Sequence, residues 1–399
     1  MNTFSRPASR ASWPVVGAAV VLALAGCGTA ARPAVASAAD SGPVTTAVTT
    51  TVTAPPATVP VAVRWSAVPP APIPALDSRT GVWTGDELIV VGRAHAHTDR
   101  PQNHAAAYDP AARTWRLLPV PAVSGIGVEG DIASVWTGTE VIVLGGGYQD
   151  AYTPATGRWR HLVLPAYASQ LGSDFALVWT GRQVVLYGGA CCDSAHRTAG
   201  VYTPATDRWQ PLSMALLGPR WTSAAWTGTE VVIAGGRGPV GGGTNATIAT
   251  AGAYDPATGT WRRLPDLPAP TWGPVVWDGA RVVVLGDGVA YAWAPGADRW
   301  TALPKGFDHR GGFAVTAAGR GRLVVWGGAI RSGQQDPTLP RSGLVFSPSG
   351  GWSALPVSPL RGRWSPVMVW TGRQVLVWGG DSVSDTASTP FADGAALTP

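Results

Sequence analysis

From about residue 63 onward, one pattern of hydrophobic and polar positions recurs seven times. Each copy begins with a short apolar segment that ends in tryptophan and a Thr-Gly or Asp-Gly turn, followed by a β-branched run that ends in glycine, such as Val231–Ala234 before Gly235-Gly236. The turns follow Trp83, Trp136, Trp179, Trp226, Trp277 and Trp370, with a degenerate copy at Ala317. Because the runs show little alternation, they predict strands that are covered on both faces.

The second half of each copy carries an aromatic residue and, seven positions later, a tryptophan. Tyr202 and Trp209 form one such pair, and Tyr254 and Trp261 form another, with a proline- and glycine-rich turn between the two members. A loop of variable length separates these pairs from the preceding glycine. Each copy therefore predicts four short strands, named A to D in chain order, and a period of about 48 residues.

These motifs together resemble the kelch-repeat β-propellers. Copies three and four carry every element of that pattern, namely the double glycine, the tyrosine and the tryptophan (Gly188-Gly189, Tyr202 and Trp209; Gly235-Gly236, Tyr254 and Trp261). The architecture is similar to that of the central domain of galactose oxidase and of the bacterial sialic-acid mutarotases. The resemblance covers 63–399 and implies an all-β, seven-bladed propeller, although copy one has only Gly92 and copy five reads Gly286-Asp287-Gly288.

The two ends of the repeat region complement each other. The last copy stops before any tryptophan strand, whereas residues 63–69, around Trp65, look like the strand that it lacks. We therefore expect the N-terminal strand to pair with the C-terminal blade, which closes the ring and removes exposed sheet edges.

The first 62 residues predict a secretion signal followed by a tether. Residues 1–26 combine Arg6 and Arg10 with an apolar run too short to span a bilayer, as in a secretory signal. Their end, Leu24 to Cys27, resembles the bacterial lipobox and implies acylation of Cys27 and a lipoprotein on the extracytoplasmic face of the cell membrane; an ordinary cleaved signal is the alternative. The Ala-, Thr- and Pro-rich segment 27–62 predicts an extended tether with a reach of roughly 100 Å.

Composition narrows the classes of function. The chain of 399 residues contains 51 Gly, 36 Pro and 20 Trp but only 13% charged residues, which excludes long helical bundles. The net charge of +5 comes from scattered arginines, so no nucleic-acid partner is expected. We expect a monomer without a cofactor.

The B–C connections vary most, so the functional surface is expected on the face that they share with the D–A connections. Three tryptophans and three arginines fall in D–A connections there: Trp221, Trp272, Trp364, Arg220, Arg310 and Arg363. Aromatic planes and guanidinium forks suit sugars or carboxylated ligands. The alternative is that these side chains fill the end of the channel.

Two further features lie in the same predicted loops. For the adjacent Cys191 and Cys192 the sequence leaves three alternatives open: a strained disulfide between them, a pair of free thiols, or bridges to other molecules. His95 and His97 alternate in an extended stretch and suit a metal ion, although solvated loop histidines are the simpler interpretation.

These observations favour a membrane-anchored binding module that presents its loop face to a protein or an envelope glycan. The first alternative is a carbohydrate-active enzyme, such as a sugar epimerase, a mutarotase or an oxidase-like protein, with Arg220, Arg310, Asp174 or Glu129 at the channel mouth. The second is a metal-dependent activity through His95 and His97. No copper-oxidase site, nucleophile triad or phosphate loop is recognisable in the sequence.

Overall fold

The computed structural model describes part of the compact unit Pro60–Pro399. The described residues are 63–94, 102–121, 130–168, 171–191, 194–195, 197–240, 245–286, 288–330, 338–383 and 388–398. The signal sequence, Cys27 and the tether lie outside these ranges. The helical segments within them, η1 (Ala166–Ala168) and η2 (Pro204–Thr206), are far too short to span a bilayer.

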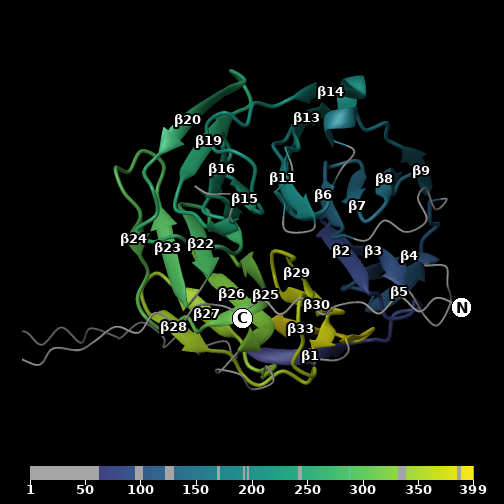
Figure 1. Ribbon diagram of the computed structural model, residues 1–399. Helices are drawn as coiled ribbons and strands as arrows, with labels where there is room; N and C mark the ends of the chain where they lie inside the picture. Colours follow the sequence, from purple (N-terminus) through teal and green to yellow (C-terminus); the bar gives the residue numbers. More distant parts are fainter. Residues whose placement is uncertain are drawn as a thin grey trace, which may run out of the picture. The chain divides into compact units, whose positions relative to one another are not determined.

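Seven antiparallel sheets, the blades, surround a central axis (Figure 1). Blade 1 contains β2 (Ser78–Trp83), β3 (Leu88–Ala94), β4 (Gln102–Asp109) and β5 (Thr114–Leu117); blade 2 contains β6 (Ala133–Trp136), β7 (Val141–Gly145), β8 (Tyr148–Thr153) and β9 (Arg158–His161). Blade 3 contains β10 (Ser173–Trp179), β11 (Val184–Cys191), β12 (Ser194–Ala195), β13 (Ala199–Thr203) and β14 (Arg208–Pro211); blade 4 contains β15 (Ala224–Trp226), β16 (Val231–Ala234), β19 (Ala251–Asp255) and β20 (Thr260–Leu264).

The remaining blades follow the same order. Blade 5 contains β21 (Val275–Trp277), β22 (Val282–Gly286), β23 (Val289–Trp293) and β24 (Thr301–Ala302); blade 6 contains β25 (Arg310–Ala317), β26 (Leu323–Ile330), β27 (Leu344–Ser347) and β28 (Gly351–Ala354). Blade 7 contains β29 (Val367–Trp370), β30 (Val375–Trp378), β33 (Gly394–Thr398) and β1 (Arg64–Val68). Two-stranded ribbons join β17 (Arg237–Pro239) to β18 (Asn245–Thr247) and β31 (Asp381–Val383) to β32 (Ser388–Pro390).

The innermost strands meet in a closed ring. Contacts run from β2 to β6, β10, β15, β21, β25 and β29 and return to β2. Blade 7 draws on both ends of the chain, because β1 pairs antiparallel with β33 from Arg64 opposite Thr398 to Val68 opposite Gly394. The predicted seven-bladed all-β propeller is therefore confirmed.

The aromatic spacing has a direct structural cause. Tyr202 lies directly opposite Trp209 across strands C and D, and their ring centroids are 5.0 Å apart. Several outer tryptophans also donate their indole N–H to a proline carbonyl of the preceding blade, as Trp159 does to Pro119 at 2.7 Å. Trp65 in β1 donates to Pro356 at 2.9 Å in the same way, so β1 is held as the tryptophan segments of blades 1, 2 and 5 are.

The hydrophobic core lies between the blades. Each cluster of buried residues combines side chains of two adjacent blades, such as Val232 and Ala253 of blade 4 with Val284 and Trp293 of blade 5. Strands covered on both faces explain the continuous apolar runs in the sequence.

The glycine doublets allow neighbouring blades to approach closely. A Cβ atom on Gly235 would lie 2.2 Å from the carbonyl oxygen of Thr271, which begins blade 5. The next residue, Gly236, donates its N–H to that same carbonyl at 2.9 Å. Blades 3 and 6 repeat this bond, since Gly189 donates to Arg220 and Gly328 donates to Arg363. The doublets of blades 3, 4 and 6 are thus points where successive blades are hydrogen-bonded through their backbones.

Alanine substitution should separate this close approach from simple backbone strain. Gly235 and Gly259 have positive φ angles of +67° and +71°, but only Gly235 has atoms within 4 Å of an added Cβ. We expect Gly259→Ala to cost about 1 kcal/mol and Gly235→Ala about 3 kcal/mol of unfolding free energy, measured in urea. Equal losses for the two variants would contradict the proposed role of the doublet.

Candidate functional site

The two ends of the ring differ in construction. On the turn face, which carries the A–B and C–D turns, each A–B turn is closed by a backbone bond such as Thr137 N–H to Glu140 at 3.0 Å. On the loop face, which carries the B–C and D–A connections, the B–C connections differ from blade to blade. Blade 2 turns tightly through Gly146-Gly147, whereas blades 4 and 7 add the ribbons β17–β18 and β31–β32.

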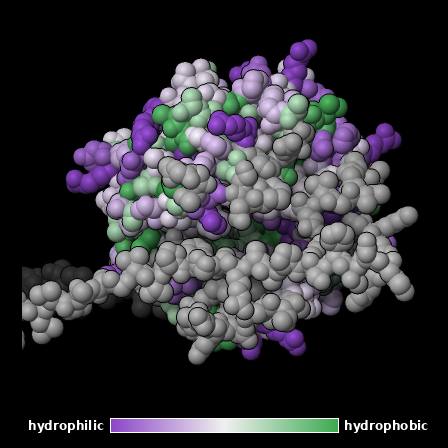
Figure 2. All heavy atoms as spheres, viewed as in Figure 1, coloured by the Kyte–Doolittle hydropathy of each residue, from purple (hydrophilic) through white to green (hydrophobic). Residues whose placement is uncertain are grey.

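The added segments of the loop face are tied to the ring and to one another. Strand β12 of blade 3 contacts β17 of blade 4. Trp221 and Trp364, in D–A connections, form backbone bridges with Arg237 of β17 and Asp381 of β31. These connections therefore form a supported rim around the channel. In Figure 2, polar and apolar residues alternate around the periphery of the face in view and do not gather in one patch.

The three predicted binding arginines lie inside the protein. Arg220 is 1% exposed and Arg363 is 0% exposed. Each guanidinium donates to the carbonyl of a glycine in its own blade's doublet: Arg220 to Gly235 at 2.9 Å, Arg310 to Gly327 at 3.0 Å and Arg363 to Gly379 at 2.9 Å.

Further contacts occupy the same arginines. Arg220 also donates to the carbonyls of Leu217 and Thr250, while Arg310 and Arg363 form ion pairs with Asp308 and Asp393. These contacts favour a structural role in blade cohesion for Arg220, Arg310 and Arg363, which is the alternative to ligand binding that the sequence left open. Sequence alone does not distinguish the two roles, because arginine serves equally well as a buried donor to backbone carbonyls and as a donor to a ligand.

The predicted tryptophans divide into two kinds. Trp221 is 8% exposed, and the guanidinium of Arg237 lies 5.4 Å from its ring centroid. Trp272 and Trp364 are only partly buried, and Trp364 packs over Gly311-Gly312 of blade 6. Trp272 and Trp364 are therefore the members of the predicted set that have surface available on the loop face.

An acidic pair lies at the loop-face end of the innermost strands. The backbone N–H of Asp174 donates to the carboxylate of Asp131 at 2.9 Å, and Asp174 adopts a left-handed φ of 54°. Asp174 remains exposed to solvent, but surrounding protein atoms and the negative charge of Asp131 raise its pKa to about 6. Sequence reasoning singled out Asp174 but missed Asp131, since only the inter-blade contact brings them together.

The loop face also carries a partly buried ion pair between blades 1 and 7. Arg79 of β2 pairs with Asp381 of β31 and donates to the carbonyl of Ser365 at 3.1 Å. Its one signal in the sequence is a charged residue within an otherwise uncharged A strand. Nearby, Arg93 lies 5.4 Å from the ring centroid of Tyr148 and joins blades 1 and 2.

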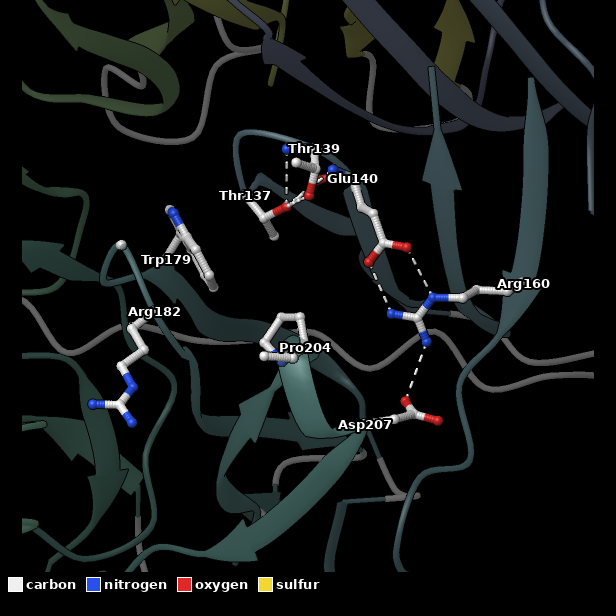
Figure 3. Close-up of a pocket in the computed structure, with 10 residues that line it drawn as sticks. Thr137, Thr139, Glu140, Arg160, Trp179, Arg182, Pro204 and Asp207 are labelled. Carbon is white, nitrogen blue, oxygen red and sulfur yellow. Dashed lines mark hydrogen bonds and ion pairs between the residues drawn. The ribbon is translucent and has the colours of Figure 1, made fainter. Parts of the chain in front are cut away.

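The turn face carries a cavity of about 700 Å³ between blades 2 and 3 (Figure 3). Trp179 and Arg182 lie on one side, and the Glu140–Arg160 ion pair lies on the other. Pro204 and Asp207 also line the cavity. Sequence reasoning did not anticipate this cavity, because the repeated turns suggested a uniform face.

Several predicted residues lie outside the described ranges: Cys27, His95, His97, Glu129 and Cys192. Cys191 ends β11, where its backbone pairs with Ser194. Within the described ranges, no three His, Cys, Asp or Glu side chains are grouped so as to hold a metal ion.

Comparison with known proteins does not assign the chain to a family. No family model matches the chain, and no curated protein matches its sequence.

Replacing one of the buried arginines should test their structural role. We expect Arg363→Met to lower the unfolding free energy by about 3 kcal/mol, because it leaves buried carbonyls without a donor. Arg361→Met, at an exposed site two residues earlier, should change it by less than about 0.5 kcal/mol. Thermal and urea unfolding measure both; equal stability would return Arg363 to the candidate ligand-binding residues.

The acidic pair should impose a pH dependence on stability. Because the pKa of Asp174 is raised from 3.8 to about 6, the folded state binds more protons than the unfolded state between these values. Stability should therefore fall as the pH rises from about 4 to about 6, and Asp174→Asn should remove this part of the fall. Carboxyl NMR titration of Asp131→Asn should show a lower pKa for Asp174; an unchanged value would exclude Asp131 as a cause.

Proposed function

We propose that this protein is an extracytoplasmic binding module, anchored to the cell membrane through acylated Cys27, whose loop face binds a protein or a glycan of the envelope. The observation that carries the proposal is the supported rim of the loop face. Ribbons β17–β18 and β31–β32 extend the B–C connections and are bridged to the D–A connections of the ring. Variable connections on a rigid scaffold are the usual place for recognition.

The rim offers chemistry suited to a macromolecular surface. Trp272 and Trp364 provide partly exposed aromatic rings, and the Arg79–Asp381 pair fixes the base of one ribbon. Val240, which follows β17, is 38% exposed and places an apolar side chain at the edge of the other ribbon. A mixture of aromatic, apolar and paired charged groups is typical of binding interfaces.

The proposed location rests on the N-terminal sequence. The lipobox-like end of the leader supports acylation of Cys27, and the tether 27–62 would hold the propeller away from the membrane. The double glycines and Tyr/Trp pairs support the further proposal that the blades are of the kelch type.

A carbohydrate-active enzyme at the channel mouth is the second candidate function. The Asp131–Asp174 pair favours it, since a carboxyl group with a raised pKa beside a second carboxylate suits acid–base chemistry. Turnover of a sugar substrate that is lost in Asp174→Asn would establish this candidate over pure binding.

Two variants of the anchor and the rim test the leading proposal. Cys27→Ser should move the protein from the detergent phase to the aqueous phase in detergent phase partitioning, while the protein should still co-sediment saturably with isolated envelopes. In that background, Val240→Asp should weaken co-sedimentation roughly tenfold. Val163→Asp is the matched control, because Val163 is 82% exposed just beyond an outer strand.

The outcomes distinguish the partner as well as the site. Protease treatment of the envelopes should abolish binding to a protein partner, and periodate treatment should abolish binding to a glycan. Equal binding by the Val240→Asp and Val163→Asp proteins would contradict the assignment to the rim. Partitioning of Cys27→Ser into the detergent phase would contradict the anchor.

A further inference from the structure

We propose that the cavity on the turn face between blades 2 and 3 is a binding site for a neutral sugar. This site is separate from the rim and does not depend on the function proposed for it. Its volume of about 700 Å³ lies within the range of about 300 to 1,000 Å³ that is usual for small-molecule sites.

The walls combine an aromatic surface with fixed polar groups. The indole of Trp179 is partly buried and faces the Glu140–Arg160 pair across the opening (Figure 3). No described residue accepts a hydrogen bond from its N–H. A half-exposed indole supplies an apolar plane for the C–H face of a sugar ring and a donor for a hydroxyl group.

One side of the cavity is held rigidly. Arg160 donates to Glu140 through two bonds of 2.9 and 2.8 Å, to Asp207 at 3.1 Å and to the Tyr202 hydroxyl at 3.0 Å. Tyr202 in turn donates to Asp207 Oδ1 at 2.6 Å. These bonds orient Asp207, whose Oδ2 accepts nothing from the described part of the chain. Orientation before binding reduces the entropy that a ligand must overcome.

The charge of the site favours a neutral ligand. Its ionisable groups are the carboxylates of Glu140 and Asp207 and the guanidinium groups of Arg160 and Arg182, so the formal charges cancel. Arg182 is exposed and forms no ion pair within the described ranges. It adds a donor opposite the acceptor of Asp207. A ligand with many hydroxyl groups, each both donor and acceptor, matches this set, whereas an ion would meet opposing charges.

Arg182 and Asp207 both occupy positions of the repeated turns that vary from blade to blade. Arg182 occupies the position of Thr139 in blade 2 and Thr229 in blade 4. Asp207 occupies the position of Gly157 and Gly259, although its φ of 50° is the left-handed conformation that favours glycine. Neither residue is required by the turn, yet both line the same cavity.

Binding of three neutral disaccharides, cellobiose, maltose and diacetylchitobiose, to the full-length protein tests the proposal. Calorimetry and saturation-transfer NMR should detect at least one of them at or below about 10 mM. Arg182→Thr and Asp207→Gly restore the residues of the neighbouring blades, so the fold should persist while each variant weakens binding about tenfold. Trp179→Ala should weaken it at least as much.

The control is Arg373→Thr, which makes the same change in the equivalent Thr-Gly-Arg-Gln turn of blade 7 and should leave binding unchanged. Val240→Asp, on the rim, should also leave sugar binding unchanged, so failure of this proposal and failure of the proposed function are distinguishable. Binding of none of the three sugars, or equal binding by Arg182→Thr, Asp207→Gly and the unmodified protein, would overturn the proposal.

Discussion

The close approach of consecutive blades at the glycine doublets is the constraint on which the ring depends. The backbone that begins blade 5 passes so near Gly235 that a side chain would collide with it, and the same carbonyl accepts the N–H of Gly236. Arg220 and Arg363 extend this link, because each accepts a bond from the preceding doublet and donates to its own. A small backbone contact thus sets the spacing at which the hydrophobic faces of the blades can pack.

This construction separates the two ends of the molecule. The glycine doublets and the buried arginines that donate to them fix the loop-face ends of the B strands. B–C connections as different as the tight turn of blade 2 and ribbon β31–β32 can therefore be built on one scaffold. The turn face is regular in its backbone, but Arg182 and Asp207 give the groove between blades 2 and 3 a polarity of its own. Both faces therefore offer a candidate binding site, and the regular backbone of the turn face does not exclude binding there.

Buried polar groups are the part of the site that sequence reasoning placed least well. Arg220 and Arg363 lie in D–A connections, as the sequence predicted, and Arg310 begins strand β25, but all three side chains are buried. Asp131 was not predicted as a site residue, because only the packing of blades 2 and 3 places its carboxylate beside Asp174. In both cases the deciding contact joins residues whose proximity depends on the ring, and the residue types alone fit a ligand equally well.

The sequence by itself determined the repeat, the four strands of each blade, the number of blades and the N-terminal strand around Trp65 that completes blade 7. It did so because turn residues and the Tyr/Trp spacing are local: Tyr202 faces Trp209 across a single turn. Only the tertiary structure decided which polar residues are buried between blades and which line a cavity. That choice depends on how neighbouring blades share buried volume and hydrogen-bond partners, and no single repeat contains this information.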